Sequence, residues 1–162
     1  MLAMTYALHG SLPVPATPMQ TYALLSDVPR TGEWSIQTEV VAWEGDARGV
    51  GATFSGRNRT AQREWTTVSR VIEDVPGEAF AWAVGPGEAI WGYRMAPHEE
   101  GTLLTLHTAF TERTAEYFVE RFGEDAAREE EIRRRAAEEG IPATLERIAG
   151  ILAREHGDAP EE

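Results

Sequence analysis

The fold is decided by residues 140–157, GIPATLERIAGILAREHG. Their large apolar residues recur at steps of four, three and four positions, which places them on one stripe of an α-helix. The stripe consists of Ile141, Leu145, Ile148 and Leu152. Pro142 suits the first turn of this helix, where its missing N–H costs nothing, and Gly157 suits its end. Because a helix with a single apolar stripe must pack against another element, we expect the preceding residues to form a sheet.

Seven segments before this helix alternate like β-strands and are separated by turns. The expected strands cover residues 4–8, 35–44, 51–59, 63–73, 78–84, 89–95 and 102–110. A change of phase at Val40 and Val41 predicts a β-bulge in the second strand. Consecutive strands joined by short turns form a meander. We therefore expect an α+β fold in which one curved antiparallel sheet of about seven strands wraps around the long C-terminal helix.

Two short helices are expected between the first and second strands. Thr17 and Pro18 suit the N-cap and the first position of a helix that reaches about Asp27. Pro29 ends this helix, and residues 30–34 form a turn or a second short helix.

Residues 112–139 are charged and predict a further helix before the terminal one. We expect Gly140 and Pro142 to separate the two helices or to kink them. The acidic runs in this region indicate mainly a solvated helix face.

The chain of 162 residues predicts a single domain, residues 1–162, with a disordered tail at 158–162. Its formal net charge of −12 disfavours nucleic acid and anionic membrane surfaces as partners. The absence of cysteine excludes disulfides, thiolate metal sites and a cysteine nucleophile. We find no signal peptide and no run long enough to cross a membrane, so we expect a cytoplasmic protein without membrane insertion, as a monomer or homodimer.

Common motifs of phosphate, zinc and hydrolase sites are missing. Residues 51–56, GATFSG, have the glycine spacing of a phosphate loop, but Arg57 and Asn58 follow where Lys and Ser or Thr are required. The four histidines are scattered, and strand parity places His107 on the face opposite Leu106. We therefore expect no metal and no cofactor.

Aromatic residues gather on the inner faces of the expected strands. Several tryptophans share these faces with hydroxyl and amide side chains. Apolar walls with a few fixed polar groups are typical of a small-molecule site, although the same aromatics can also pack as a filled core. We expect a cavity between the sheet and the terminal helix, entered near Trp34 and the loops after Asn58 and Gly85. Its expected lining is Trp34, Phe54, Asn58, Trp65, Thr67, Ser69, Trp82, Trp91, Tyr93, Thr108, Phe110, Leu145 and Ile148.

Several segments also carry a family resemblance, in the order strand, two short helices, six strands and long helix. They include GVGATFSGRNR at 49–59, WTTVSRV at 65–71, PGEAFAW at 76–82 and GIPATLERI at 140–148. Together they resemble the START/birch-pollen-allergen superfamily (SRPBCC), in its bacterial polyketide cyclase/dehydrase-like branch. The resemblance covers nearly the whole chain and implies the helix-grip fold. Many members of this branch bind or carry hydrophobic molecules, and a few are aromatase/cyclases.

The resemblance transfers to individual residues only in part. In the aromatase/cyclases of this branch, a strand Trp is followed at alternate positions by a Ser and an Arg that bind the polyketide. Trp65 matches the first position, Thr67 stands at the Ser position and Ser69 at the Arg position. Arg70 is one step out of phase, so we expect it to face away unless a bulge shifts the register. The missing Arg lowers the expectation of a cyclase.

We expect the chain to bind a small hydrophobic molecule, either aromatic, polycyclic or lipid-like, in the cavity. A non-enzymatic alternative is a protein-interaction module without a ligand, with residues 112–139 as its docking surface. Alanine substitution along the inner faces separates these readings, because only a binding protein loses a ligand.

The enzymatic alternative is a polyketide cyclase/aromatase that shapes a poly-ketone chain for aldol closure. Tyr93 is the best candidate for a proton donor, with Arg57 or Arg70 as a weaker oxyanion partner. No general base is evident, because Glu39 and Glu64 fall on doubtful or outward faces.

Overall fold

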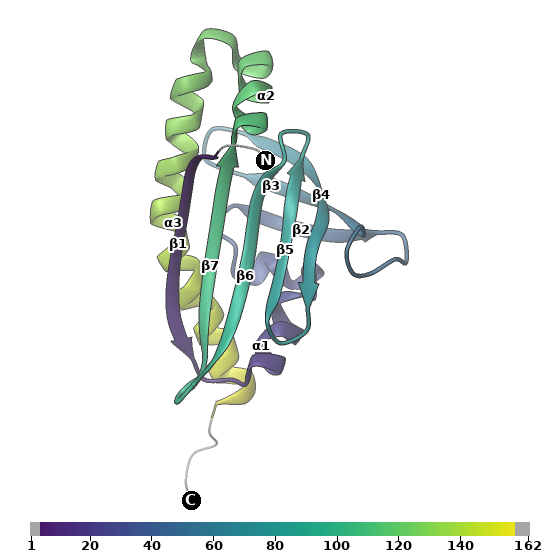
Figure 1. The fold of residues 1–162 in the computed structure, drawn as a ribbon, viewed down its shortest axis with the longest axis vertical. Helices are drawn as coiled ribbons and strands as arrows, with labels where there is room; N and C mark the ends of the chain where they lie inside the picture. Colours follow the sequence, from purple (N-terminus) through teal and green to yellow (C-terminus); the bar gives the residue numbers. More distant parts are fainter. Residues whose placement is uncertain (1–3, 158–162) are drawn as a thin grey trace, which may run out of the picture.

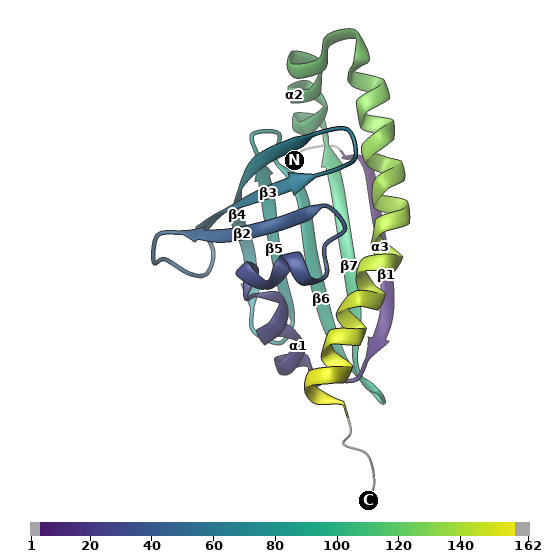
Figure 2. The ribbon, with the colours of Figure 1, turned by 180° about the vertical axis from the view of Figure 1, so that it is seen from behind.

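A seven-stranded antiparallel sheet organises the computed structural model, which describes residues 4–157; the expected tail at 158–162 lies outside this range. The strand order is β1-β7-β6-β5-β4-β3-β2. The long helix α3 runs along one face of the curved sheet, as Figure 1 and Figure 2 show from opposite sides. The expected α+β helix-grip fold is confirmed. Its elements are β1 (Met4–Val14), α1 (Pro18–Leu25), η1 (Val28–Glu33), β2 (Thr38–Glu44), β3 (Thr53–Arg59), β4 (Glu64–Val75), β5 (Ala79–Gly85), β6 (Ala89–His98), β7 (Gly101–Thr111), α2 (Glu112–Phe122), η2 (Gly123–Asp125) and α3 (Ala126–His156).

β1 is longer than its alternation predicts, since it continues past Leu8 through Gly10 and Pro13 to Val14. It is an edge strand that pairs only with β7, so Pro13 removes no hydrogen bond to a second neighbour. Gly10 faces α3, where a Cβ atom would lie 2.8 Å from Cγ2 of Ile141. The two apparent strand breakers are therefore compatible with the edge position and with close packing of the helix.

Alternation assigns the inner face of the meander correctly. In β3, Phe54, Gly56 and Asn58 are buried, whereas Arg57 and Arg59 are exposed. The faces of β4 follow the same parity, and the paired registers of β3, β4, β5 and β6 bring the inward residues together.

The bulges differ in position from the one expected. β2 begins at Thr38 rather than Ser35, and its register shift lies between Thr38 and Val40, just before the expected pair of valines. Further shifts lie between Val71 and Glu73 in β4 and between Met4 and Tyr6 in β1. Such shifts bend a sheet locally, which fits its wrapping around α3.

The two short helices follow β1 as expected. The Thr17 hydroxyl accepts a hydrogen bond from the Gln20 N–H at 3.1 Å, and the Gln20 side chain accepts one from the Thr17 N–H at 2.9 Å. This capping box starts α1 at the predicted residue. In η1, Arg30 forms salt bridges with Glu33 and with Glu155 of α3, so η1 is tied to the end of the long helix.

The expected separation of two helices at Gly140 and Pro142 is wrong. α3 runs through both residues without interruption, and the chain instead turns at Gly123, whose φ of +56° lies in the left-handed region. Pro142 is exposed, so water can solvate the carbonyl that its missing N–H leaves unbonded. Ile141 and Leu145 are buried on either side of it and anchor the helix to the sheet. Tertiary packing therefore outweighs the local tendency to break.

The apolar stripe of α3 packs as its spacing predicts. Its four residues are buried, Ile151 joins them, and they form one core cluster with Val14 and Leu104 of the β1 and β7 strands. The same cluster continues along the inner face of the sheet to Trp34, Phe54 and Tyr93. α2 and the first turns of α3 form a hairpin beyond the sheet (Figure 1). Within residues 4–157, no helix is both long and apolar enough to cross a membrane.

Candidate functional site

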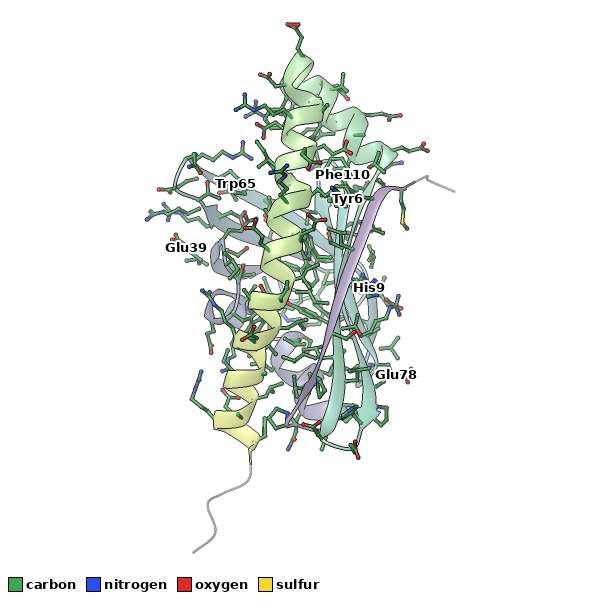
Figure 3. All side chains as sticks on the ribbon, turned by 90° about the vertical axis from the view of Figure 1, so that its left-hand side faces the viewer. Tyr6, His9, Glu39, Trp65, Glu78 and Phe110 are labelled. Carbon is green, nitrogen blue, oxygen red and sulfur yellow. The ribbon has the colours of Figure 1, made fainter. Side chains whose placement is uncertain are left out.

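A cavity of about 540 Å³ lies between the inner face of the sheet and the helices α2 and α3. Figure 3 shows Trp65 on one side of α3 and Tyr6 and Phe110 on the other, and all three residues line the cavity. The volume lies within the range of about 300–1,000 Å³ that is typical of small-molecule sites. The aromatics of the inner face therefore surround a space rather than filling it.

Trp82 lies at the centre of the aromatic wall. Its ring centroid lies 6.0 Å from that of Phe54, 6.1 Å from that of Phe80 and 5.5 Å from that of Tyr93. Phe54 also meets Trp43 edge-on, with centroids 5.6 Å apart. Tilted and edge contacts of this kind hold aromatic rings in fixed orientations, so the wall is shaped before a ligand enters.

A hydrogen bond between two aromatic side chains is buried in this wall. Trp34 Nε1 donates to the hydroxyl oxygen of Tyr93 at 3.1 Å, and the two residues are only 1% and 3% exposed. Burial raises the pKa of Tyr93 to about 12, and the hydrogen bond from Trp34 opposes part of this shift. The phenol is therefore protonated at neutral pH. It makes no second hydrogen bond within residues 4–157, so its O–H remains available to donate into the cavity.

Replacing Tyr93 by phenylalanine is expected to lower the free energy of unfolding by about 1–3 kcal/mol, because the buried N–H of Trp34 loses its acceptor. Urea denaturation followed by circular dichroism measures this change. Tyr117→Phe is the matched control, because the hydroxyl of half-buried Tyr117 makes no hydrogen bond with any residue in the range 4–157. Equal losses in the two variants would contradict the prediction.

Polar side chains of β3 and β4 form a second fixed group in the wall. Asn58 Oδ1 accepts from the Thr38 hydroxyl at 2.8 Å, and Asn58 Nδ2 donates to the Thr67 hydroxyl oxygen at 3.2 Å. Because Thr67 accepts this bond, its own hydroxyl proton can point to a ligand. On the opposite side, the Thr108 hydroxyl donates to the backbone oxygen of Ile90 at 2.8 Å. The cavity thus presents a few oriented polar atoms among apolar walls.

The expected lining residues outside α3 are brought together around the cavity. They are Trp34, Phe54, Asn58, Trp65, Thr67, Ser69, Trp82, Trp91, Tyr93, Thr108 and Phe110. The two expected on α3, Leu145 and Ile148, do not line the cavity and are buried in the core cluster. Toward the cavity, α3 presents Arg133 and the smaller residues Ala136, Ala137, Gly140 and Thr144. The small side chains leave space for the cavity, which the longer side chains of the apolar stripe would fill. The prediction that Leu145 and Ile148 line the cavity is therefore wrong.

The arginines considered for catalysis lie outside the cavity. Arg70 and Arg57 lie on the outer face of the sheet, where Arg70 forms a salt bridge at 2.8 Å with Glu88 of the turn between β5 and β6, and Arg57 lies 3.5 Å from Glu64. The register shift in β4 comes after Arg70 and does not turn it inward. Glu39 is exposed as well, beside Arg59 at 3.6 Å.

His107 lies on the face away from the cavity, as parity predicts. It pairs with Gly92, where a Cβ atom would lie only 2.7 Å from its Nε2. Burial, with a smaller effect from Arg94, lowers the pKa of His107 and favours the neutral ring. Over residues 4–157, no group of three or more His, Asp or Glu side chains is placed to hold a metal ion.

The α2 end of the cavity contains residues that sequence reasoning missed. The alternation of β1 could have indicated that Tyr6 faces inward. Steps of four and three positions in α2 place Thr114, Phe118 and Arg121 on one helix face. Arg63 and Arg133 carry no such signal, because they reach this end from separate parts of the chain. The missed lining residues here are Tyr6, Arg63, Thr114, Tyr117, Phe118, Arg121, Phe122 and Arg133.

Comparison with known proteins gives the family. The model of the polyketide cyclase/dehydrase and lipid transport family matches residues 7–151. The chain belongs to this family. No curated protein matches the chain by sequence.

Solved structures of the same shape include a bacterial relative and two aromatase/cyclases. The Polyketide_cyc-like protein Cgl2372 from Corynebacterium glutamicum is 41% identical over 96% of this chain and 97% of that one, with a TM-score of 0.68. The Zhui aromatase/cyclase from Streptomyces sp. R1128 has a TM-score of 0.73 at 19% identity, over 93% of this chain and 94% of that one. The di-domain ARO/CYC StfQ from the steffimycin biosynthetic pathway has a TM-score of 0.72 at 16% identity, over 94% of this chain and 52% of that one. This chain thus spans about half of StfQ, and the two aromatase/cyclases show the fold alone.

This member of the polyketide cyclase/dehydrase and lipid transport family has a neutral residue where the resemblance implies an inward Arg. Ser69 stands there, buried and lining the cavity opposite its strand neighbour Phe54. None of the described residues that line the cavity is an Asp, Glu or His. The inner part of the cavity therefore has hydrogen-bonding groups but neither a cation nor a general base.

Proposed function

We propose that the chain binds a small hydrophobic molecule, aromatic, polycyclic or lipid-like, between the sheet and α3. The observation that carries this proposal is the 540 Å³ cavity, with its aromatic wall around Trp82 and its free donors at Tyr93 and Thr67. Burial of apolar surface supplies the affinity, and the few oriented polar atoms supply selectivity. Membership of the family supports a ligand-binding or cyclase role.

A polyketide cyclase/aromatase is the second candidate, and the available O–H of Tyr93 favours it. A proton donor beside a carbonyl assists aldol closure of a chain that the cavity holds folded. Two features weigh against it. With a pKa of about 12, Tyr93 is a weak acid at neutral pH, and no carboxylate or imidazole belongs to the described lining. Turnover of a poly-β-ketone that Tyr93→Phe abolishes while binding is retained would favour this candidate.

Replacing Ala137 by tryptophan is expected to weaken binding of the neutral probe N-phenyl-1-naphthylamine by about tenfold or more, a loss of about 1.4 kcal/mol. Ala137 is buried and lines the cavity, so an indole ring there occupies the space that the probe needs. Fluorescence titration of the probe measures the dissociation constant.

Ala127→Trp is the matched control, because it adds the same ring at an exposed position of α3 outside the lining. Its affinity for the probe is expected to equal that of the wild type. Failure of the wild-type protein to bind, or equal affinities of the two variants, would overturn the proposal. Native mass spectrometry of the freshly purified protein then identifies a hydrophobic molecule that copurifies with it.

A further inference from the structure

Three arginines surround one phenylalanine at the α2 end of the cavity. The guanidinium carbons of Arg63, Arg121 and Arg133 lie 5.9, 5.2 and 5.9 Å from the ring centroid of Phe122. Arg63 comes from the turn between β3 and β4, Arg121 from α2 and Arg133 from α3, and all of them line the cavity. Three cations from distant parts of the chain therefore converge on one end of an apolar space.

The positive charge of this arginine cluster is only partly neutralised. Arg133 forms a salt bridge with Glu129 at 2.9 Å. Arg63 and Arg121 form no ion pair with any residue in the range 4–157, although the chain has a net charge of −12 and many exposed carboxylates. Four other arginines likewise form no ion pair within this range, but none of them lines the cavity: Arg48, Arg128, Arg147 and Arg154. The arginines on the strands, in contrast, are each paired with a glutamate: Arg57, Arg59, Arg70 and Arg94.

Arg121 is exposed, whereas Arg63 and Arg133 are half-buried, so the energetic cost of this arrangement in the unliganded protein comes from these two. Loss of water, followed by repulsion from Arg133, lowers the pKa of Arg63, and attraction to the Glu129 carboxylate opposes part of this shift. The cost of holding like charges together falls when an anion is placed between them, and the effect is stronger here than in bulk water because the site is partly enclosed. The cluster is thus electrostatically suited to an anion.

The aromatic neighbours hold the guanidinium groups in place. Arg63 lies over the Trp65 ring at 4.5 Å from its centroid, and Arg133 lies over Phe118 at 5.2 Å. A guanidinium that covers a ring with its flat face keeps N–H groups at its edge, where carboxylate, sulfonate or phosphate oxygens can accept them. Trp65 also lines the cavity, so it connects the cluster to the aromatic wall.

We propose that the ligand is an amphipathic anion whose apolar body lies along the aromatic wall and whose anionic group binds Arg63 and Arg121. This inference rests on the proposed function and adds the chemical class of the ligand. Arg133, already paired with Glu129, lies beside the anion and contributes less. Tyr93 lies farther along the wall, and its hydroxyl donates a hydrogen bond to a polar substituent on the largely apolar body of the ligand.

A pair of probes tests the proposal, because 1-anilinonaphthalene-8-sulfonate differs from N-phenyl-1-naphthylamine only by an anionic sulfonate. The wild-type protein is expected to bind the sulfonate probe more tightly than the neutral one. Arg63→Gln and Arg121→Gln together are expected to weaken binding of the sulfonate probe by about tenfold or more, since hydrogen bonds to charged groups are lost. Their affinity for the neutral probe is expected to stay within about twofold of the wild type, which also shows that the cavity remains folded.

Arg70→Gln is the control, because it removes an arginine of the outer face and is expected to change neither affinity. A neutral probe that fails to bind the wild type overturns the proposed function itself. If the neutral probe binds but the sulfonate probe binds no more tightly, only the proposal of an anionic ligand is overturned. The same holds if the neutral probe binds and the Arg63 and Arg121 substitutions leave the affinity for the sulfonate probe unchanged. Equal weakening of both probes by these substitutions also overturns that proposal, because the arginines then act on the shape of the cavity.

Discussion

Replacing Gly101 by alanine is expected to lower the free energy of unfolding by about 3–5 kcal/mol, from backbone strain and steric overlap together. Gly101 begins β7 with a φ of +132°, a conformation that L-residues rarely adopt. A Cβ atom there would lie 2.6 Å from the Val14 oxygen and 2.7 Å from the Ala16 oxygen. These backbone atoms cannot retreat, because the Thr102 hydroxyl donates to the same Ala16 oxygen at 2.7 Å. Urea denaturation followed by circular dichroism measures the loss.

Gly45→Ala separates the two causes. Gly45 also has a positive φ, +84°, but a Cβ atom there would meet nothing within 4 Å. This variant is therefore expected to lose only about 1–2 kcal/mol, from the backbone conformation. Equal losses of unfolding free energy in Gly45→Ala and Gly101→Ala would mean that steric overlap at Gly101 does not contribute to the destabilisation.

Replacing Ile148 by alanine is expected to lower the free energy of unfolding by about 2–5 kcal/mol. Ile148 is 0% exposed at the centre of the core cluster, so the deletion leaves a cavity lined by apolar side chains. Because Ile148 does not line the ligand cavity, affinity for N-phenyl-1-naphthylamine is expected to stay within about twofold of the wild type. Urea denaturation and probe titration of the same preparation measure both quantities.

Ile132→Ala provides the comparison on the same helix, since Ile132 is 45% exposed. Its stability is expected to change by no more than about 0.5 kcal/mol. A large loss of probe affinity in Ile148→Ala with little loss of stability would contradict the assignment of Ile148 to the core.

Much of the fold follows from short-range patterns in the sequence. The strict alternation of β3 and β4 places Phe54, Asn58 and Ser69 on one face, and the capping signals of Thr17 start α1 where the structure has it. These predictions succeed because side-chain parity and helix caps are decided within a few residues.

The remainder depends on packing between distant segments. Gly140 and Pro142 predict a break in α3, but the buried residues around them hold the helix intact against the sheet. The side of α3 that faces the cavity is likewise set by how its apolar stripe packs on β1 and β7. Arg63 and Arg121 come together only through the final fold. No local pattern contains information of this kind.

The pairing of β1 with β7 also has a consequence for folding during synthesis. The hydrogen bond from the Thr5 hydroxyl to the Phe110 oxygen joins residues 105 positions apart, whereas each strand from β2 to β6 pairs with the next strand along the chain. At a translation rate of about 5–20 residues per second, β1 remains without its partner for about 5–20 seconds. We expect the local hairpins to form first and β1 and α3 to join them last, which makes closure of the sheet around the helix a late and slow step.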